Sequence, residues 1–197
     1  MRSLMKHFEN FSRGYIFIAG PTCSGKTTLT HKILNYLSDR GIGVTYIQQD
    51  NYFKDLENIP KCHLGYLTDS INAFHVNELK QDFKDLIKNG KAALPLYDIS
   101  KNKRLSSKEF VTKSPVILVE GLHAISIFHN YTDSMFIYVD TDIEICLKRR
   151  VERDRRFFGV ASARVTENFQ DCIMPMYEQY ILPQKKFSDV ILYDGGR

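Results

Sequence analysis

The residues with the clearest chemical meaning form a short glycine-rich run near the N-terminus. Residues 20–27 read GPTCSGKT, which matches the phosphate-loop pattern GxxxxGK[ST]. Glycines in such a loop let backbone N–H groups surround phosphate oxygens, and the following helix adds the positive end of its dipole. Lys26 is expected to reach the β- and γ-phosphates, and the Thr27 hydroxyl to ligate Mg²⁺. The predicted nucleotide-binding residues are Gly20, Pro21, Thr22, Cys23, Ser24, Gly25, Lys26, Thr27 and Thr28.

Carboxylates follow three of the other predicted strands. Glu120 comes directly after the apolar run VILV and is expected to hold Mg²⁺, through water. Asp50 follows the second predicted strand and is expected to accept a proton from an acceptor hydroxyl, although Asp50-Asn51 is also typical of a turn. For Asp140 and Asp142 we favour structural roles, with Asp142 as the N-cap of the next helix.

A basic stretch at residues 148–156 is the third chemical element. It contains six basic and two acidic side chains, an excess equal to the net charge of +4 of the whole chain. Arg149, Arg153 and Arg156 recur at helical spacing and share a face, and Arg150 projects beside them. A charged run is often only a solvated helix face. Because this one holds the entire net charge, we expect at least one arginine to bind phosphate oxygens.

These residues need a frame of alternating strands and helices to position them. Strands are predicted at residues 15–19, 44–47, 116–119, 136–139 and 190–192, and helices at 26–40, 76–89, 143–156 and 167–180, with a kink or break at Pro175. Such alternation predicts an α/β fold with a parallel sheet flanked by helices. We expect one domain over residues 1–197, with a β-hairpin insertion at about 92–113 and a basic helical lid at about 148–165.

Composition excludes several classes of protein. The chain is 43% hydrophobic and 25% charged, which is ordinary for a globular domain. The near-neutral remainder of the chain argues against a nucleic-acid surface, and no apolar run has the length of a signal peptide or a membrane span. The four cysteines show no metal-binding or redox spacing, so we expect reduced thiols in a cytoplasmic protein.

The sequence resembles the uridine kinase and phosphoribulokinase group of P-loop kinases, most of all its uridine–cytidine kinases. The resemblance extends from Tyr15 to Leu192 and rests on several ordered motifs besides the phosphate loop. They are QDNYFK at 49–54, PLYD at 95–98, VEG at 119–121, YVDTD at 138–142, RRVERD at 149–154, PMYEQY at 175–180 and KKFSDVI at 185–191.

The resemblance implies ATP- and Mg²⁺-dependent transfer of a phosphoryl group to the 5′-hydroxyl of a pyrimidine nucleoside, a salvage reaction. By the same resemblance Asp50 is the general base, Thr27 and Glu120 are the Mg²⁺ residues, and Arg153 is a lid arginine on ATP. Lys26 and Arg150 join Asp50 as catalytic residues. The residues implied at the acceptor are Asp50, Phe53, Asn72, Tyr97, Asn102, Arg150 and Asn168.

Three of these positions depart from the family pattern. Asn72 stands where we expect the family's ribose-binding acid, within DSINAFH at 69–75. Asn102 is the nearest counterpart of a base-reading histidine, and Asn168 of a glutamine that helps to read the base. The lid reads FFGV at 157–160 in place of ERGR, although Arg155 and Arg156 offer compensation.

Two alternatives follow from these departures. One keeps the chemistry and changes the acceptor to another riboside or a small alcohol such as pantothenate. The other is a nucleotide-binding regulatory module with little catalysis, against which the retained Asp50 argues. The expected partner is a small hydroxyl acceptor, with no nucleic acid and no membrane. The resemblance also allows a homo-oligomer, since related kinases often form one, but no interface is legible in the sequence.

Overall fold

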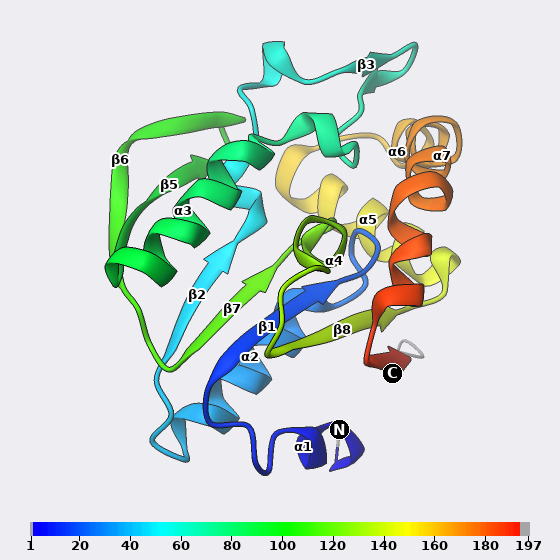
Figure 1. Cartoon of the computed structure of the whole chain (residues 1–197). Helices are drawn as coiled ribbons and strands as arrows, with labels where there is room; N and C mark the ends of the chain where they lie inside the picture. Colours follow the sequence, from blue (N-terminus) through cyan, green and yellow to red (C-terminus); the bar gives the residue numbers. More distant parts are fainter. Residues whose placement is uncertain (1, 194–197) are drawn as a thin grey trace.

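A five-stranded parallel sheet forms the centre of the molecule, in the order β2-β7-β1-β8-β9 (Figure 1). The computed structural model describes residues 2–193. The strands are β1 (Gly14–Ala19), β2 (Val44–Gln48), β7 (Val116–Glu120), β8 (Ser134–Asp140) and β9 (Val190–Tyr193). This arrangement confirms the predicted fold class.

Helices cover both faces of this sheet, because its central strands are apolar on both sides. Every residue of β7 is buried, as expected for a parallel strand between two layers. One face packs against α1 (Arg2–His7) and α2 (Lys26–Ser38), the other against α3 (Val76–Asn89) and α4 (Ala124–Phe128). Parallel strands bring their carboxyl ends to one edge, and that edge carries the phosphate loop, Asp50 and Glu120.

A long antiparallel hairpin extends beside α3 at the β2 edge of the sheet (Figure 1). Its strands are β5 (Lys91–Asp98) and β6 (Lys103–Thr112), within one residue of the range 92–113 predicted to hold a hairpin. Arg104 of this hairpin binds Glu78 of α3 through two hydrogen bonds of 2.8 Å. This bidentate pair fixes the hairpin, and therefore Tyr97 on β5, relative to the rest of the chain.

A second, shorter hairpin was not predicted. It consists of β3 (Lys61–Cys62) and β4 (Gly65–Tyr66), within a stretch that showed few periodic signals. Cys62 on this hairpin forms a disulfide with Cys172, 110 positions later in the sequence. The expectation of four reduced cysteines is therefore wrong, and cysteine usage gives no support for a cytoplasmic location. Spacing alone cannot reveal a pair that the fold brings together over such a distance.

The C-terminal part is a nearly continuous helical run along the opposite edge of the sheet (Figure 1). Pro175 does not break it. The run takes wide π-helical turns at Phe169–Ile173 and Tyr177–Ile181, on either side of a short helix that contains the proline. Such turns accommodate the hydrogen bond that a proline cannot donate. Its segments are α6 (Ser162–Asn168), η4 (Phe169–Ile173), α7 (Met174–Met176), η5 (Tyr177–Ile181) and η6 (Leu182–Phe187).

The basic helix α5 spans Ile143–Phe158 and ends at Gly159, whose φ of 65° requires a residue that tolerates the left-handed region. Asp142 precedes it, as predicted for an N-cap, but its carboxylate accepts a hydrogen bond from the Tyr193 hydroxyl instead of capping the helix. Asp140 pairs with Lys185 at 2.7 Å, in keeping with a structural role. Among the described residues, no helix combines the length and apolar character that crossing a bilayer requires.

Candidate active site

The phosphate loop leaves β1 and enters α2 with the backbone that anion binding needs. Gly20 has φ 150°, and a Cβ at this position would lie 2.5 Å from the Val139 carbonyl oxygen. Gly25, with φ 95°, begins the helix in the left-handed region. Lys26 is 8% exposed and its Nζ donates to the Pro21 carbonyl at 2.8 Å, so the ammonium lies over the loop. These features place a positive charge and a helix N-terminus at one point.

Glu120 and Thr27 meet beside this loop. The Thr27 hydroxyl lies 3.3 Å from both carboxylate oxygens of Glu120, which is itself 7% exposed at the end of β7. The Tyr46 hydroxyl donates to Glu120 at 2.8 Å and holds the carboxylate in place. Burial and the adjacent Glu120 charge raise the pKa of Tyr46, so its phenol stays protonated and remains a donor.

Asp50 is the second residue of the turn η1 (Gln49–Tyr52), which follows β2. Its side chain is open to the cavity, yet protein surrounds it closely enough that burial is the largest influence on its acidity. Burial and the negative charge of Glu120 raise the pKa of Asp50 to about 6, against the opposing effect of Lys26. Asp50 is therefore a carboxylate of unusually high proton affinity, ionised at neutral pH.

A buried ion pair joins the basic helix to the other side of the site. Arg150 donates to Asp69 at 3.0 Å, and the two side chains are 9% and 3% exposed. Arg150 also reaches the Thr22 hydroxyl of the phosphate loop at 3.4 Å. Asp69 uses one oxygen for this pair. Its Oδ2 is buried without a hydrogen-bond partner in the described structure, which leaves an acceptor for a ligand.

His123 contacts the backbone of Asp69 and holds it in position. Its ring is fully buried, and burial lowers its pKa to about 4, so the imidazole is neutral. Nε2 lies 2.9 Å from the Asp69 carbonyl oxygen, which only accepts hydrogen bonds, so this nitrogen carries the proton. The contact fixes the backbone at Asp69 and thereby the position of its carboxylate.

An aromatic wall stands at the far side of the site from the phosphate loop. Phe53 follows η1, and its ring centroid lies 4.2 Å from that of Phe74 and 5.5 Å from that of Tyr97. Asn51 accepts a hydrogen bond from the Tyr97 backbone N–H at 3.3 Å, which ties the hairpin to η1. Such a wall suits a flat, partly apolar ligand.

One cavity of about 1310 Å³ contains these groups. This exceeds the roughly 300–1,000 Å³ typical of a site for a single small ligand, so two small molecules fit. Its lining includes most of the residues predicted from the sequence. They are Thr22, Cys23, Ser24, Gly25, Lys26, Thr27, Thr28, Asp50, Phe53, Tyr97, Asn102, Glu120, Arg150 and Arg153.

Two predicted acceptor residues do not lie in this cavity. Asn72 is exposed on the turn η3 (Ile71–Ala73), where its backbone N–H donates to the Ser70 hydroxyl. Asn168 lies instead near the β3–β4 hairpin, 3.9 Å from where a Cβ on Gly65 would be. The acid that the structure brings to the cavity from this stretch is Asp69, three positions before Asn72. Gly20 and Pro21 shape the phosphate loop without lining the cavity.

Sequence reasoning missed Asp69, although a signal was available. Asp69 is the first residue of DSINAFH at 69–75, the stretch identified as the acceptor segment. As an acid at the start of that stretch, it was itself a candidate for binding the acceptor. Aligning the acid to Asn72 shifted the expected contact by three positions. An isolated acid in a partly apolar stretch, far from any predicted basic residue, gives no indication that it pairs with Arg150 from a helix 81 positions later.

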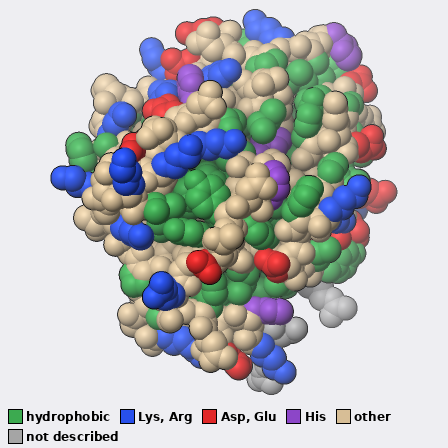
Figure 2. Space-filling model, viewed as in Figure 1, with side chains coloured by type: hydrophobic (Ala, Val, Ile, Leu, Met, Phe, Trp, Pro, Cys, Tyr) green, Lys and Arg blue, Asp and Glu red, His purple; other side chains and the backbone are tan. Residues whose placement is uncertain are grey.

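The lid arginines differ in what they contact. Arg153 is 43% exposed and pairs with Asp154 at 2.8 Å while lining the cavity. Arg149 lies 3.3 Å from the Cys23 carbonyl oxygen of the phosphate loop. Phe157 and Phe158, in place of the family's charged lid residues, are exposed and also line the cavity. The basic charge at this end is therefore partly neutralised within the protein. On the face seen in Figure 2, basic and acidic side chains are intermixed.

The residues present fit a nucleoside triphosphate and its magnesium ion. The helix N-terminus and the Lys26 ammonium supply positive charge, and Thr27 and Glu120 offer adjacent oxygens. Hard oxygen donors of this kind are those that Mg²⁺ prefers, and Mg²⁺ usually retains water and substrate oxygens beside them.

The comparisons with known proteins agree with this geometry. The profile of the "Phosphoribulokinase / Uridine kinase family" matches residues 15–196. A uridine kinase of Macrococcus caseolyticus is 38% identical over 187 residues, which covers 92% of this chain and 88% of that protein. A uridine kinase of Staphylococcus aureus is 35% identical, with 92% and 87% covered.

Solved structures share the fold at low sequence identity. A possible uridine kinase from Bacillus stearothermophilus superimposes with a TM-score of 0.65 at 20% identity, covering 97% of this chain and 96% of that one. Phosphoribulokinase from Rhodobacter spheroides gives 0.67 at 15% identity, with 92% and 70% covered. The chain thus belongs to the phosphoribulokinase and uridine kinase family, and is a phosphotransferase that acts on an alcohol acceptor.

Proposed function

We propose that this protein transfers the γ-phosphoryl group of ATP to the 5′-hydroxyl of a nucleoside, with uridine and cytidine as the first acceptors to test. The observation that carries the proposal is the position of Asp50. Its carboxylate, which has a raised pKa, lies in the same cavity as the phosphate loop and the aromatic wall. A protein that only binds nucleotide has no need of such a group. Relatives 35–38% identical are named uridine kinases.

In the proposed reaction the phosphate loop and Lys26 hold the β- and γ-phosphates in line with the acceptor. Mg²⁺, held by Thr27 and Glu120, would neutralise the phosphate charge. Asp50 orients the acceptor hydroxyl and takes its proton as the new O–P bond forms and the bond to the leaving oxygen breaks. The carboxylate is ionised for this step at neutral pH, because its pKa lies at about 6.

Arg150 and Arg153 supply positive charge from the lid side. Arg150 already bridges Asp69 and the Thr22 hydroxyl, so it holds the acceptor side and the phosphate side of the cavity together. Arg153 pairs with Asp154 at the cavity wall, from which it can turn to phosphate oxygens. We assign Arg150 to positioning and Arg153 to the nucleotide.

For the acceptor we propose that Asp69 replaces Asn72 in the predicted role. The unpartnered Oδ2 of Asp69 is a buried, charged acceptor, which suits the vicinal hydroxyls of a ribose. Phe53 and Tyr97 provide ring faces for the base, and Asn102 at the hairpin turn offers an amide at the edge of the same cavity. A pantothenate-like alcohol lacks both the flat base and the vicinal hydroxyls, so it uses fewer of these contacts.

The test is ADP release by purified protein with MgATP and one acceptor at a time. The panel contains uridine, cytidine, adenosine, guanosine, nicotinamide riboside and pantothenate, with uridine 5′-phosphate identified by mass spectrometry. Lys26→Met, purified in the same way, measures contaminating kinases. Deoxyuridine and 5′-deoxyuridine separate the need for the 2′-hydroxyl from the need for the reacting hydroxyl.

We expect turnover with uridine or cytidine, a higher KM for deoxyuridine, and none with 5′-deoxyuridine. Turnover with pantothenate alone would contradict the nucleoside assignment while retaining the kinase. No turnover with any acceptor, in protein that still binds MgATP, would favour the regulatory module.

A further inference from the structure

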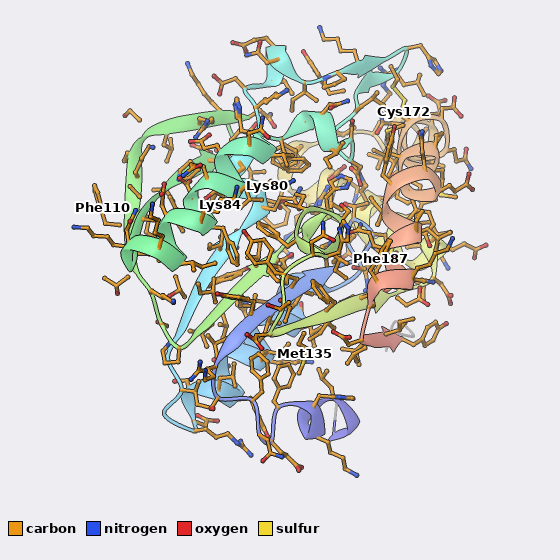
Figure 3. The ribbon with its side chains drawn as sticks, viewed as in Figure 1. Lys80, Lys84, Phe110, Met135, Cys172 and Phe187 are labelled. Carbon is orange, nitrogen blue, oxygen red and sulfur yellow. A yellow bond between two sulfur atoms is a disulfide. The ribbon has the colours of Figure 1, made fainter. Side chains whose placement is uncertain are left out.

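Three side chains capable of metal binding come together outside the cavity, and a fourth, Asp171, contacts one of them. Cys62 and His63 lie on the β3–β4 hairpin, and Asp171 and Cys172 lie on η4. Figure 1 shows the hairpin reaching over the helical run, and Figure 3 labels Cys172 on that run. None of the four lines the cavity. The proposed kinase reaction uses none of them.

The donor atoms of three of these side chains are close enough to share one ion, and Asp171 contacts the group through His63. Donor atoms of Cys62, His63 and Cys172 all lie within 4.8 Å of one another. His63 Nε2 lies 3.4 Å from Asp171 Oδ2. Two ligands about 2.0–2.2 Å from a tetrahedral zinc ion are roughly 3.3–3.5 Å apart, so this pair already has the spacing of neighbouring ligands. His63 and Asp171 are 69% and 53% exposed, so an ion can enter from solvent.

The donor set selects the class of metal. Two thiolates, one imidazole and one carboxylate are ligands of zinc and of similar borderline-soft ions. Mg²⁺ and Ca²⁺ require oxygen ligands and find one carboxylate here. The phosphate site, with its hydroxyl and carboxylate oxygens, has the opposite preference. The two sites can therefore be loaded with different metals in one chain.

The disulfide decides whether the site exists. In the structure Cys62 and Cys172 are joined, and a disulfide sulfur carries no thiolate charge to give to a metal. A dithiol reductant converts the bond to two thiols and becomes a disulfide itself, in a balanced two-electron exchange. Zinc then replaces the two thiol protons, which are released to solvent.

We propose that Cys62, His63, Asp171 and Cys172 form a zinc site that opens when the Cys62–Cys172 disulfide is reduced. The oxidised chain holds the hairpin to η4 by a covalent bond, and the reduced chain holds it by the metal. The hairpin leads through Tyr66 and Thr68 to Asp69, which all line the cavity. Reduced, metal-free protein is the one form in which neither link restrains this segment.

The test is metal binding, which requires no enzymatic activity. Protein is reduced with a phosphine, freed of reductant without air, and titrated with Zn²⁺ in competition with a chromophoric chelator. We expect one Zn²⁺ per reduced chain with a Kd of about 1 μM or tighter, and no stoichiometric binding by the oxidised chain. With Co²⁺, the reduced chain should show thiolate-to-metal charge transfer and the strong visible bands of tetrahedral cobalt.

Variants separate this site from adventitious binding. Cys62→Ser is expected to abolish the cobalt charge-transfer signal or reduce it to that of one thiolate. His63→Ala and Asp171→Asn are each expected to weaken Zn²⁺ binding at least about tenfold. Both keep the disulfide when oxidised, so their folding is checked in that form by thermal denaturation. Cys23→Ser, a free cysteine elsewhere, and His31→Ala, an exposed histidine on α2, are the matched controls that should bind as the parent does.

Two results would overturn the proposal. One is equal Zn²⁺ binding by the oxidised and reduced chains, which would show that the thiolates are not ligands. The other is unchanged binding by His63→Ala and Asp171→Asn, which would show that the four-residue site is wrong. Neither result bears on the kinase reaction, which is measured separately.

Discussion

The two halves of the cavity are built in different ways. The phosphate half comes from one continuous stretch, in which eight consecutive residues supply the turn, the ammonium and a metal-binding hydroxyl. Glu120 of β7 and, by our proposal, Arg153 of α5 are added to it from elsewhere in the chain. The acceptor half is assembled from η1, the segment before η3, the tip of the β5–β6 hairpin and one arginine of α5.

This difference explains where sequence reasoning succeeded. The conformation of a continuous loop is set by residues that are neighbours in the sequence, so its residues lie where the motif predicts them. The acceptor half depends on contacts between distant segments, such as Arg150 with Asp69 and Arg104 with Glu78. Those contacts have no local pattern. The acceptor half is therefore where the chain can change its substrate without disturbing the phosphate half.

The largest effect is expected from a change in the phosphate half. Lys26→Met removes the buried ammonium from the loop and should lower kcat by about a hundred- to a thousandfold. ATP binding should weaken as well, measured by calorimetry. Lys80→Met, an exposed lysine on α3 labelled in Figure 3, is the matched control and should retain parental kinetics. Comparable losses in both variants would show that the effect is not specific to the loop.

A smaller and more selective effect is expected in the acceptor half. Asp69→Asn keeps the shape and one acceptor but loses the charge, so we expect the acceptor KM to rise about tenfold or more. It also leaves the buried Arg150 without its carboxylate partner, so the variant should melt lower than the parent and its folding is checked first. The KM for ATP should change less than about twofold. Asn72→Ala, on the exposed turn nearby, should leave both constants unchanged. A larger effect of Asn72→Ala than of Asp69→Asn would restore the original assignment.

The pH dependence links the two halves through Asp50. Its carboxylate must be ionised to accept the hydroxyl proton, and its pKa lies at about 6 in the free protein. We therefore expect kcat/KM for the acceptor to be level above that pH and to fall about tenfold per unit below it. Steady-state kinetics between pH 5 and 8, with an unfolding check at each pH, measure this limb. A rate that stays level down to pH 5 would contradict the raised pKa of Asp50.

The smallest effect is expected from the contact that anchors the hairpin. Arg104→Leu removes the bidentate pair with Glu78, which is partly exposed, so we expect the free energy of unfolding to fall by about 1 kcal/mol. The Arg104 guanidinium lowers the pKa of Glu78, so this stabilisation is present at neutral pH and is lost as pH falls through the acidic range. Denaturant melts at pH 7 and pH 4 should differ less for the variant than for the parent.

The strands of the sheet could be predicted from the sequence because their apolar pattern is clear. The phosphate loop, Asp50 and Glu120 could be located because each of them follows one of these strands. It did not reveal the Cys62–Cys172 disulfide, since the hairpin and η4 meet only in the folded chain. Pro175 was expected to kink or break its helix. The helical run continues through it, so the break is wrong, and π-helical turns lie on either side of the proline. Asp69 was overlooked because its partner, Arg150, comes from another element.

The most direct test concerns Asp50 itself. Asp50→Asn preserves size and one hydrogen-bond acceptor but cannot take a proton. We expect kcat to fall at least about a hundredfold, while the Kd for MgATP stays within about twofold of the parent. The raised pKa means that ionised Asp50 opposes folding above pH 6, so the variant should melt no lower than the parent at pH 7. Parental turnover in a folded Asp50→Asn protein would contradict the account of this cavity as a kinase site with Asp50 as its base.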